Sequence, residues 1–376
     1  MDYTRIDAFI DRLVETSTPE RTAWNMEKIR EGRAASWNYI DGCMLTALME
    51  MGRITGQERY LEFVERCIDH FVGEDGAIRT FNPEACNLDD INEGRVLFAL
   101  YERAGKQQYR LAAEKLAKQL EGHPRTAEGN FWHKAIYPHQ VWLDGIYMAQ
   151  PFRALYARSF GGGDYSDIVK QIATVHDRMR DPQKGLYYHG YDASRKAFWA
   201  DQESGCSKNF WLRSLGWFAV ALADLLDILP EGQDRDKLAA IFSDLMASMD
   251  RYADAQTGLY WQVPDQGDRE GNYLETSGSA MMAYAMLKGA RLGFLPKEYA
   301  AKGKKTFDGI AEKYLTFTDE GIGLGGICLV AGLGPETNRR RDGSYEYYIS
   351  EPVVENDAKG VAPFVLAYTE IKQLGA

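Results

Sequence analysis

The pattern that most limits the fold of this chain is a repeat of a helix, a glycine-containing turn and a second helix. Three copies are clear, and they begin at Ala47 (ALMEMGRITGQERYLEFVERCIDHF), Ala99 (ALYERAGKQQYRLAAEKLAKQL) and Ala154 (ALYARSFGGGDYSDIVKQIATVHDRM). Looser copies begin at Ala221 and Ala285. In each copy a less polar helix comes before the turn and a more polar helix follows it. This order is typical of a helical array with an inner and an outer layer.

The two ends of the chain supply one further pair. The segment APFVLAYTEIKQLG, from Ala362, predicts a sixth less polar helix, and its more polar partner is the N-terminal helix, roughly from Arg5 to Thr16. An open solenoid needs polar caps at both ends, whereas here an outer helix comes first and an inner helix last, which favours a closed ring. We therefore predict an all-α fold, an (α/α)6 barrel with short strands in its loops, as one domain over residues 1–376. The alternative is an irregular helical array.

The charge and the cysteines exclude several classes of protein. Acidic residues outnumber basic ones by 55 to 44, so a surface that coats nucleic acid is not expected, although a local pocket can still bind a small anion. No apolar run is long enough to span a membrane, and the N-terminus carries Asp and Arg where a signal peptide would be apolar. The five widely spaced cysteines predict neither disulfides nor a zinc site, so we expect a cytoplasmic protein.

A pocket is expected where the connections after the outer helices gather. These connections are rich in Gly and aromatic residues, as in EDGAIRTF, EGNFWHKA, KGLYYHGYD, TGLYWQVPD and EGIGLGGI. In a toroid they all lie on one face, at the N-terminal ends of the inner helices. Aromatic rings there can stack on sugars, and polar groups can bind hydroxyls, although each ring could instead be core packing. The candidate substrate contacts are Tyr39, His133, Trp142, His189, Trp211, Arg213 and Trp217.

Two carboxylates are the candidates for acid–base chemistry. Asp144 has apolar neighbours in QVWLDGIYMAQPF, and desolvation there would raise its pKa toward that of a useful general acid. It could instead stabilise the start of a helix. Asp89, in CNLDDINEGR, is a second carboxylate that would push the two pKa values apart. Asp90 competes with it, or caps a helix that starts at Ile91.

Other motifs predict no metal and no cofactor. The sequence has no H-E-x-x-H, P-loop or EF-hand spacing. The glycines 161–163 are interpreted as a linker, and Arg339–Arg341 as a solvated loop. Arg213, between two tryptophans, could bind a carboxylate of the substrate or form a structural ion pair.

Several longer stretches resemble a known family. They are WNYIDG at Trp37, NLDDINEGR at Asn87, FWHKAIYPHQVWLDGIYMAQPF at Phe131, LYYHGYD at Leu186 and NFWLRSLGWFAVAL at Asn209, followed by NYLETSGSAMMAYAMLKG and DGSYEYYISEPVVENDAKG. Through them nearly the whole chain resembles the glycoside hydrolase family of unsaturated rhamnogalacturonyl hydrolases, which is related to the unsaturated glucuronyl hydrolases. The resemblance implies an (α/α)6 fold.

The resemblance also implies a reaction and a set of roles. The substrate would be a small oligosaccharide that a lyase has left with a 4,5-unsaturated uronic acid at its non-reducing end, and the enzyme would hydrate the double bond. The family's acid/base matches Asp144 and its second pocket carboxylate matches Asp89. His189, Arg213 and Trp217 match substrate-pocket positions. Tyr39 and His133 match less closely, and Tyr191 stands where the family more often has Trp.

Two alternatives from other classes remain open at this stage. One is a sugar-binding or scaffold protein without activity on the same toroid, although such a protein would be expected to have lost Asp144. The other is a sugar epimerase or isomerase, which would use paired His bases such as His133 and His189. We expect no nucleic-acid or membrane partner and a monomer or dimer, and the leaving sugar is not specified by the sequence.

Overall fold

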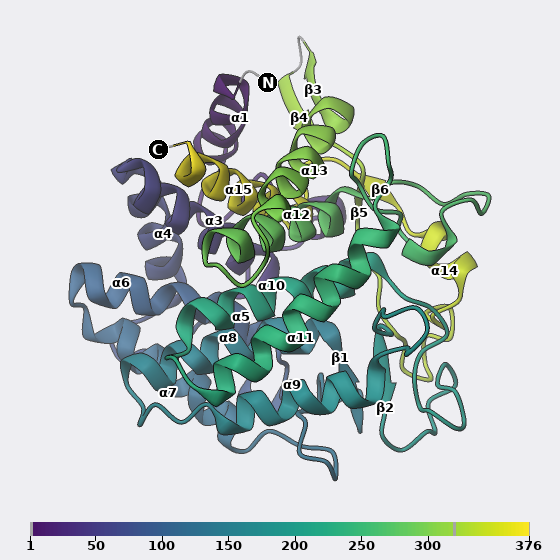
Figure 1. Cartoon of the computed structure of the whole chain (residues 1–376). Coiled ribbons are helices and arrows are strands. Elements are labelled where there is room, and N and C mark those ends of the chain that lie inside the picture. Colours follow the sequence, from purple (N-terminus) through teal and green to yellow (C-terminus); the bar gives the residue numbers. More distant parts are fainter. Residues whose placement is uncertain (1–2, 319–320, 376) are drawn as a thin grey trace.

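The computed structural model describes residues 3–318 and 321–375, and within them two concentric layers of helices form a barrel (Figure 1). The inner layer consists of α3 (Tyr39–Thr55), α5 (Asp89–Asn92) continued by the 3₁₀ helix η2 (Glu93–Arg95) and α6 (Val96–Ala104), α8 (Leu143–Ser159), α10 (Leu212–Ile228), α12 (Thr276–Arg291) and α15 (Ala358–Leu374). The outer layer consists of α1 (Thr4–Glu15), α4 (Glu58–Phe71), α7 (Gln107–Glu121), α9 (Ser166–Met179), α11 (Gln233–Met249) and α13 (Glu298–Tyr314). The predicted (α/α)6 barrel is therefore confirmed.

The ring is closed by the two ends of the chain. Helix α15 packs against both α12 and α3, which completes the inner layer. Helix α1 covers α15 from outside, where the Lys372 ammonium lies 3.1 Å from the Asp7 carboxylate. The Tyr368 hydroxyl also donates a hydrogen bond of 3.2 Å to the carbonyl of Tyr3. This is the pairing of first and last helices that the repeat predicts, and α1 and α15 lie in the same part of the molecule in Figure 1.

The difference between the layers follows from their side chains. Helix α10 is buried on nearly all sides, whereas the outer helix α4 buries a single apolar stripe. Inner helices also approach one another closely at glycines. A Cβ on Gly216 would lie 2.6 Å from the Met281 sulfur, and one on Gly278 would lie 2.4 Å from Leu212. Contacts this short have no room for a methyl group, so these glycines set how tightly the inner helices pack.

Short strands and short helices occupy the connections. The antiparallel pairs are β1 (Gln140–Trp142) with β2 (Gly190–Asp192), β3 (Leu315–Thr318) with β4 (Gly321–Leu324), and β5 (Ile327–Cys328) with β6 (Val353–Val354). The short helices are α2 (Met26–Glu31), α14 (Tyr345–Ser350), and the 3₁₀ turns η1 (Pro83–Ala85), η3 (Asp250–Tyr252) and η4 (Pro264–Gln266). The pair β1–β2 matters most for function, because it ties the start of α8 to the segment that carries His189.

Three smaller expectations can be compared with the structure. The glycine linker lies between α8 and α9, as predicted. Helix α5 begins at Asp89 rather than at Ile91, so Asp90 lies in its first turn and the capping alternative for Asp90 is wrong. In the arginine run, Arg339 and Arg340 are exposed but Arg341 is half-buried. The five cysteines are free, and no helix of the described residues is long and apolar enough to cross a membrane.

Candidate active site

The predicted site residues gather at the N-terminal ends of the inner helices. Tyr39 is the first residue of α3, Asp89 the first of α5, Asp144 the second of α8 and Arg213 the second of α10. These ends also carry backbone N–H groups that have no partner within the helix, and they favour negative charge. The candidate residues therefore lie on the face of the barrel where the connecting segments predict the site.

Asp144 lies against a buried imidazole. Its Oδ2 is 3.3 Å from Nε2 of His189, although the two atoms are not aligned as a hydrogen bond, and neither has another partner among the described residues. On the other side of the ring, Nδ1 of His189 lies 2.7 Å from the Tyr348 hydroxyl. The backbone explains the approach, since the N–H of Leu143 donates to the carbonyl of His189 at 3.2 Å.

Asp144 is not the N-cap of α8, but it is an acidic residue in the first turn of that helix, as the helix-start alternative also allows. The N-cap residue of α8 is Trp142, and no side chain there accepts a hydrogen bond from the first turn. The Asp144 side chain is 13% exposed, so its carboxyl group is accessible but largely surrounded by protein. A carboxyl group that is free of structural hydrogen bonds is available for proton transfer.

Asp89 has a different environment, because a cation is in contact with it. The Lys134 ammonium lies 2.6 Å from Oδ2 of Asp89, and Nε2 of His133 lies 3.6 Å from Oδ1. Burial would raise the pKa of Asp89, but Lys134 and then His133 outweigh it, so the pKa lies below its usual value. Asp89 is therefore ionised. Burial and the Asp89 charge raise the pKa of its neighbour Asp90 to about 6.

The predicted aromatic residues hold the two imidazoles. Trp142 stacks on His133 with ring centres 4.3 Å apart and meets the His189 ring edge-on at 5.5 Å. Trp211 lies 4.7 Å from His189 and stacks on Tyr348. Both indoles are at least 95% buried, so they fix the histidines more than they offer open faces. Burial is also the main reason that the pKa of His133 falls to about 4, which leaves this ring neutral at pH 7.

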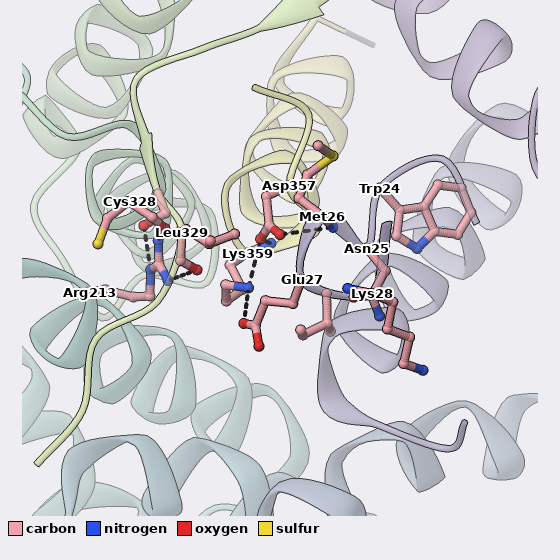
Figure 2. Close-up of polar contacts among 12 residues, drawn as sticks. Trp24, Asn25, Met26, Glu27, Lys28, Arg213, Cys328, Leu329, Asp357 and Lys359 are labelled. Atoms are coloured by element: carbon pink, nitrogen blue, oxygen red, sulfur yellow. Dashed lines mark hydrogen bonds and ion pairs between the residues drawn. The ribbon is translucent and has the colours of Figure 1, made fainter. Parts of the chain in front are cut away.

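Arg213 is engaged by the protein itself. Its guanidinium donates to the hydroxyl of Ser277 at 2.7 Å and lies 3.6 Å from Glu275. It also donates to the carbonyls of Cys328 and Leu329 (Figure 2). The side chain is 1% exposed. These contacts agree with the structural ion pair that the sequence left open, and a direct contact of Arg213 with substrate stays a prediction.

Trp217 lies deeper than a pocket residue at the helix ends. It is on α10, more than one turn beyond Arg213, and stacks on Tyr147 with ring centres 4.5 Å apart. It is 2% exposed. Its position is that of a core residue beneath the site.

Three charged residues that sequence reasoning missed form a cluster on the other side of the site. The Lys359 ammonium lies 2.7 Å from Glu27 and 3.0 Å from Asp357, and the N–H of Met26 donates to Asp357 (Figure 2). These contacts tie α2 to the first turn of α15. The signal in the sequence is weak, because the partners lie at opposite ends of the chain.

Tyr39 lies between the two groups of charges. Its pKa is raised well above the usual value, by burial first and then by Glu27 and Asp89, while Arg213 opposes the shift. The hydroxyl is therefore a neutral hydrogen-bond donor at any ordinary pH. Lys134 and Tyr348 were also missed, although both lie within the quoted stretches FWHKAIYPHQ and DGSYEYYIS.

The cavities found among the described residues lie away from these carboxylates. One of about 250 Å³ lies between residues 19–35 and helices α3 and α4. Another, of about 840 Å³, opens at the opposite end of the barrel, where Asp224 pairs with Arg95 and Lys288. Within residues 3–318 and 321–375, no group of three or more His, Cys, Asp or Glu side chains could hold a metal ion.

Comparison with known proteins identifies the family. The sequence matches the description Glycosyl Hydrolase Family 88 over residues 9–374. The chain belongs to this family. Membership makes the protein a glycoside hydrolase, and the predicted resemblance is confirmed at this level.

Individual members of the wider group agree with the assignment. An unsaturated rhamnogalacturonyl hydrolase of Bacillus subtilis is 27% identical over 307 residues, which cover 77% of this chain and 78% of the relative. The solved structure of a family 105 glycoside hydrolase of C. acetobutylicum is 40% identical, with a TM-score of 0.88 over 92% of this chain and 97% of that one. The unsaturated glucuronyl hydrolase of Bacillus sp. GL1, 16% identical, shares the fold with a TM-score of 0.61 over 89% of this chain and 86% of that one.

Proposed function

We propose that this family 88 glycosidase acts on lyase-generated oligosaccharides with a 4,5-unsaturated uronic acid at the non-reducing end. The preferred substrate is unsaturated galacturonyl-rhamnose, by analogy with the relative from Bacillus subtilis. The five free cysteines suit a reducing compartment, so the proposed location is the cytoplasm.

The observation that carries the proposal is the pair of carboxylates in unlike surroundings. Asp144 has only a histidine nitrogen, at 3.3 Å, beside its Oδ2, whereas Asp89 is paired with an ammonium at 2.6 Å. The proposal therefore assigns the fixed negative charge to Asp89 and the transferable proton to Asp144. Hydration of a polarised double bond needs such a single acid/base, unlike ordinary glycoside hydrolysis, which uses two carboxyl groups in turn.

In the proposed reaction, Asp144 gives its proton to C4, and the C4=C5 electron pair forms the new C–H bond. Positive charge develops at C5 and on the ring oxygen, where the Asp89 carboxylate stabilises it. A water molecule adds its oxygen to C5 and returns a proton to Asp144. The resulting hemiketal opens by breaking the bond from C5 to the ring oxygen. The hemiacetal left at C1 then releases the second sugar and a 4-deoxy-5-keto uronate.

The test is a panel of lyase-generated unsaturated disaccharides, each with its saturated counterpart. Loss of the ultraviolet absorbance of the double bond, together with release of the second sugar, is expected for the unsaturated compounds only. Cleavage of the saturated counterparts at a similar rate would overturn the proposal, since an ordinary glycosidase needs no double bond.

A further inference from the structure

The surroundings of Asp89 and Asp144 differ most at Lys134, a residue that the sequence analysis did not single out. Lys134 is held beside Asp89 by backbone hydrogen bonds on both sides, from Leu88 N–H to the carbonyl of His133 and from Ala135 N–H to the carbonyl of Ala85. Its ammonium lies 2.6 Å from Asp89, and the lysine side chain is 24% exposed. The other two cations near the site, Arg213 and Lys359, are each 1% exposed.

We propose that Lys134 is a positioning residue that keeps Asp89 as the carboxylate and leaves the transferable proton to Asp144. The inference rests on the function proposed above, because only there do the two acids need opposite protonation states. Lys134 would act through Asp89 rather than on the reacting atoms.

The groups around Asp89 do not offer a second candidate for this task. His133 contributes less than Lys134 to the lowered pKa of Asp89, and its own pKa of about 4 leaves it neutral at pH 7. Tyr39 is an un-ionised hydroxyl, so neither group supplies positive charge at pH 7. Asp90 adds negative charge and would favour protonation of Asp89. The titratable or charged groups that face Asp89 are Asp90 on its own helix, Tyr39 and Cys43 on α3, and His133 and Lys134 on the loop before β1. Of these, Lys134 alone is positively charged at pH 7.

The consequence for the reaction is that activity is lost below a certain pH. When Asp89 takes up a proton, the charge that stabilises positive charge at C5 is lost. With Lys134 in place this happens only below the usual pKa of an aspartate. Without it, burial is no longer opposed by a cation, the pKa of Asp89 rises, and activity falls at a higher pH.

The experiment compares the pH dependence of kcat/KM for the wild type, Lys134→Met and Lys134→Arg. Removal of an opposite charge at this distance moves an aspartate pKa by about 1–3 units. We expect the acid limb of Lys134→Met to move up in pH by at least about 1 unit, and Lys134→Arg to restore it. Lys106→Met is the matched control, since it breaks ion pairs of 2.8 Å with Glu65 and Asp69 between outer helices. Its acid limb should not move.

The Asp89→Asn variant keeps the test decisive if Lys134→Met misfolds. With no carboxyl group at position 89, the acid limb should disappear, and adding Lys134→Met should shift nothing further. An acid limb that persists in Asp89→Asn would overturn the proposal. So would a Lys134→Met enzyme with a raised KM and an unmoved limb, because that lysine would simply bind substrate.

A direct titration separates this inference from the proposed function. The carboxyl carbon of Asp89, labelled with carbon-13 and assigned by Asp89→Asn, reports its protonation by NMR whether or not the enzyme turns over. If the wild type consumes none of the unsaturated disaccharides, the proposed function fails. An Asp89 carboxyl that titrates at the same pH with and without Lys134 would refute the role of the lysine alone.

Discussion

The two carboxylates at the N-terminal ends of α5 and α8 each have a histidine neighbour, yet the third group differs. His189, beside Asp144, meets the hydroxyl of Tyr348 at 2.7 Å, while Asp89 meets both His133 and the ammonium of Lys134. A hydroxyl can donate or accept a hydrogen bond, so it allows His189 either neutral tautomer. An ammonium can only donate and fixes a negative charge opposite it. Similar carboxylate–imidazole pairs therefore differ in charge environment, because only Asp89 has a cation beside it.

The largest effect is expected from removing the proton donor. Asp144→Asn keeps the shape of the side chain but cannot transfer a proton to C4. General acid–base groups contribute about 10²–10⁴-fold in rate, and the same group acts twice here, so kcat should fall by the upper end of that range or more. Asp144 lies in the first turn of α8 without capping it, where loss of an acidic side chain costs at most about 1 kcal/mol, so the melting temperature should change little.

Turnover and calorimetric binding of an unsaturated disaccharide, measured on the same preparation, check this prediction. Binding without turnover is the expected result. If Asp144→Asn instead destabilised the protein while the molecules that remain folded kept their turnover, Asp144 would be structural. Asp89 would then become the candidate acid.

A smaller loss is expected from Asp89→Asn, because this change removes a stabilising charge and leaves the donor intact. Losing one preorganised electrostatic partner typically costs about 10²–10³-fold, and we expect the lower end. Steady-state kinetics of Asp89→Asn and Asp144→Asn, measured under the same conditions, show which variant loses more activity. A greater loss in Asp89→Asn than in Asp144→Asn would reverse the roles assigned to the two residues.

The hydroxyl behind His189 should matter less than either carboxylate. Tyr348→Phe removes one neutral hydrogen bond, worth about 0.5–1.5 kcal/mol, so kcat should fall by about 2–10-fold. The control is Tyr347→Phe, whose hydroxyl accepts from the N–H of Gly332 and does not touch His189. Equal effects of the two changes on kcat would mean that the Tyr348 hydroxyl only stabilises the loop.

No effect is expected from a chelator. Proton transfer supplies the whole of the proposed reaction, and the partners of both carboxylates described above are side chains of the protein. Activity after exhaustive treatment with EDTA should equal that of the untreated enzyme. Activity that is lost and then returns on addition of a divalent ion would show that the enzyme needs a metal ion that the proposed reaction does not include.

Particular residues show which parts of the fold and of the site could be predicted from the sequence. The helix pairs were predictable because burial on one face or on all faces leaves a visible period, and the place of Asp144 followed from its position at the start of an inner helix. The depth of Trp217 and the many partners of Arg213 could not be predicted from the sequence, because they depend on how neighbouring helices pack. Lys134 and Tyr348 were missed for the same reason, since each meets its partner across separate connections. The functional role of each site residue stays a prediction.

The pairing of α1 with α15 also has a consequence for how the protein is made. During translation, α3 and α12 emerge before α15, and the flanks that α15 will cover have no intramolecular partner until then. Exposed apolar flanks of incomplete chains favour aggregation. The inner ring can therefore close only after α15 has been made, and until then the apolar flanks of α3 and α12 expose the incomplete chain to aggregation.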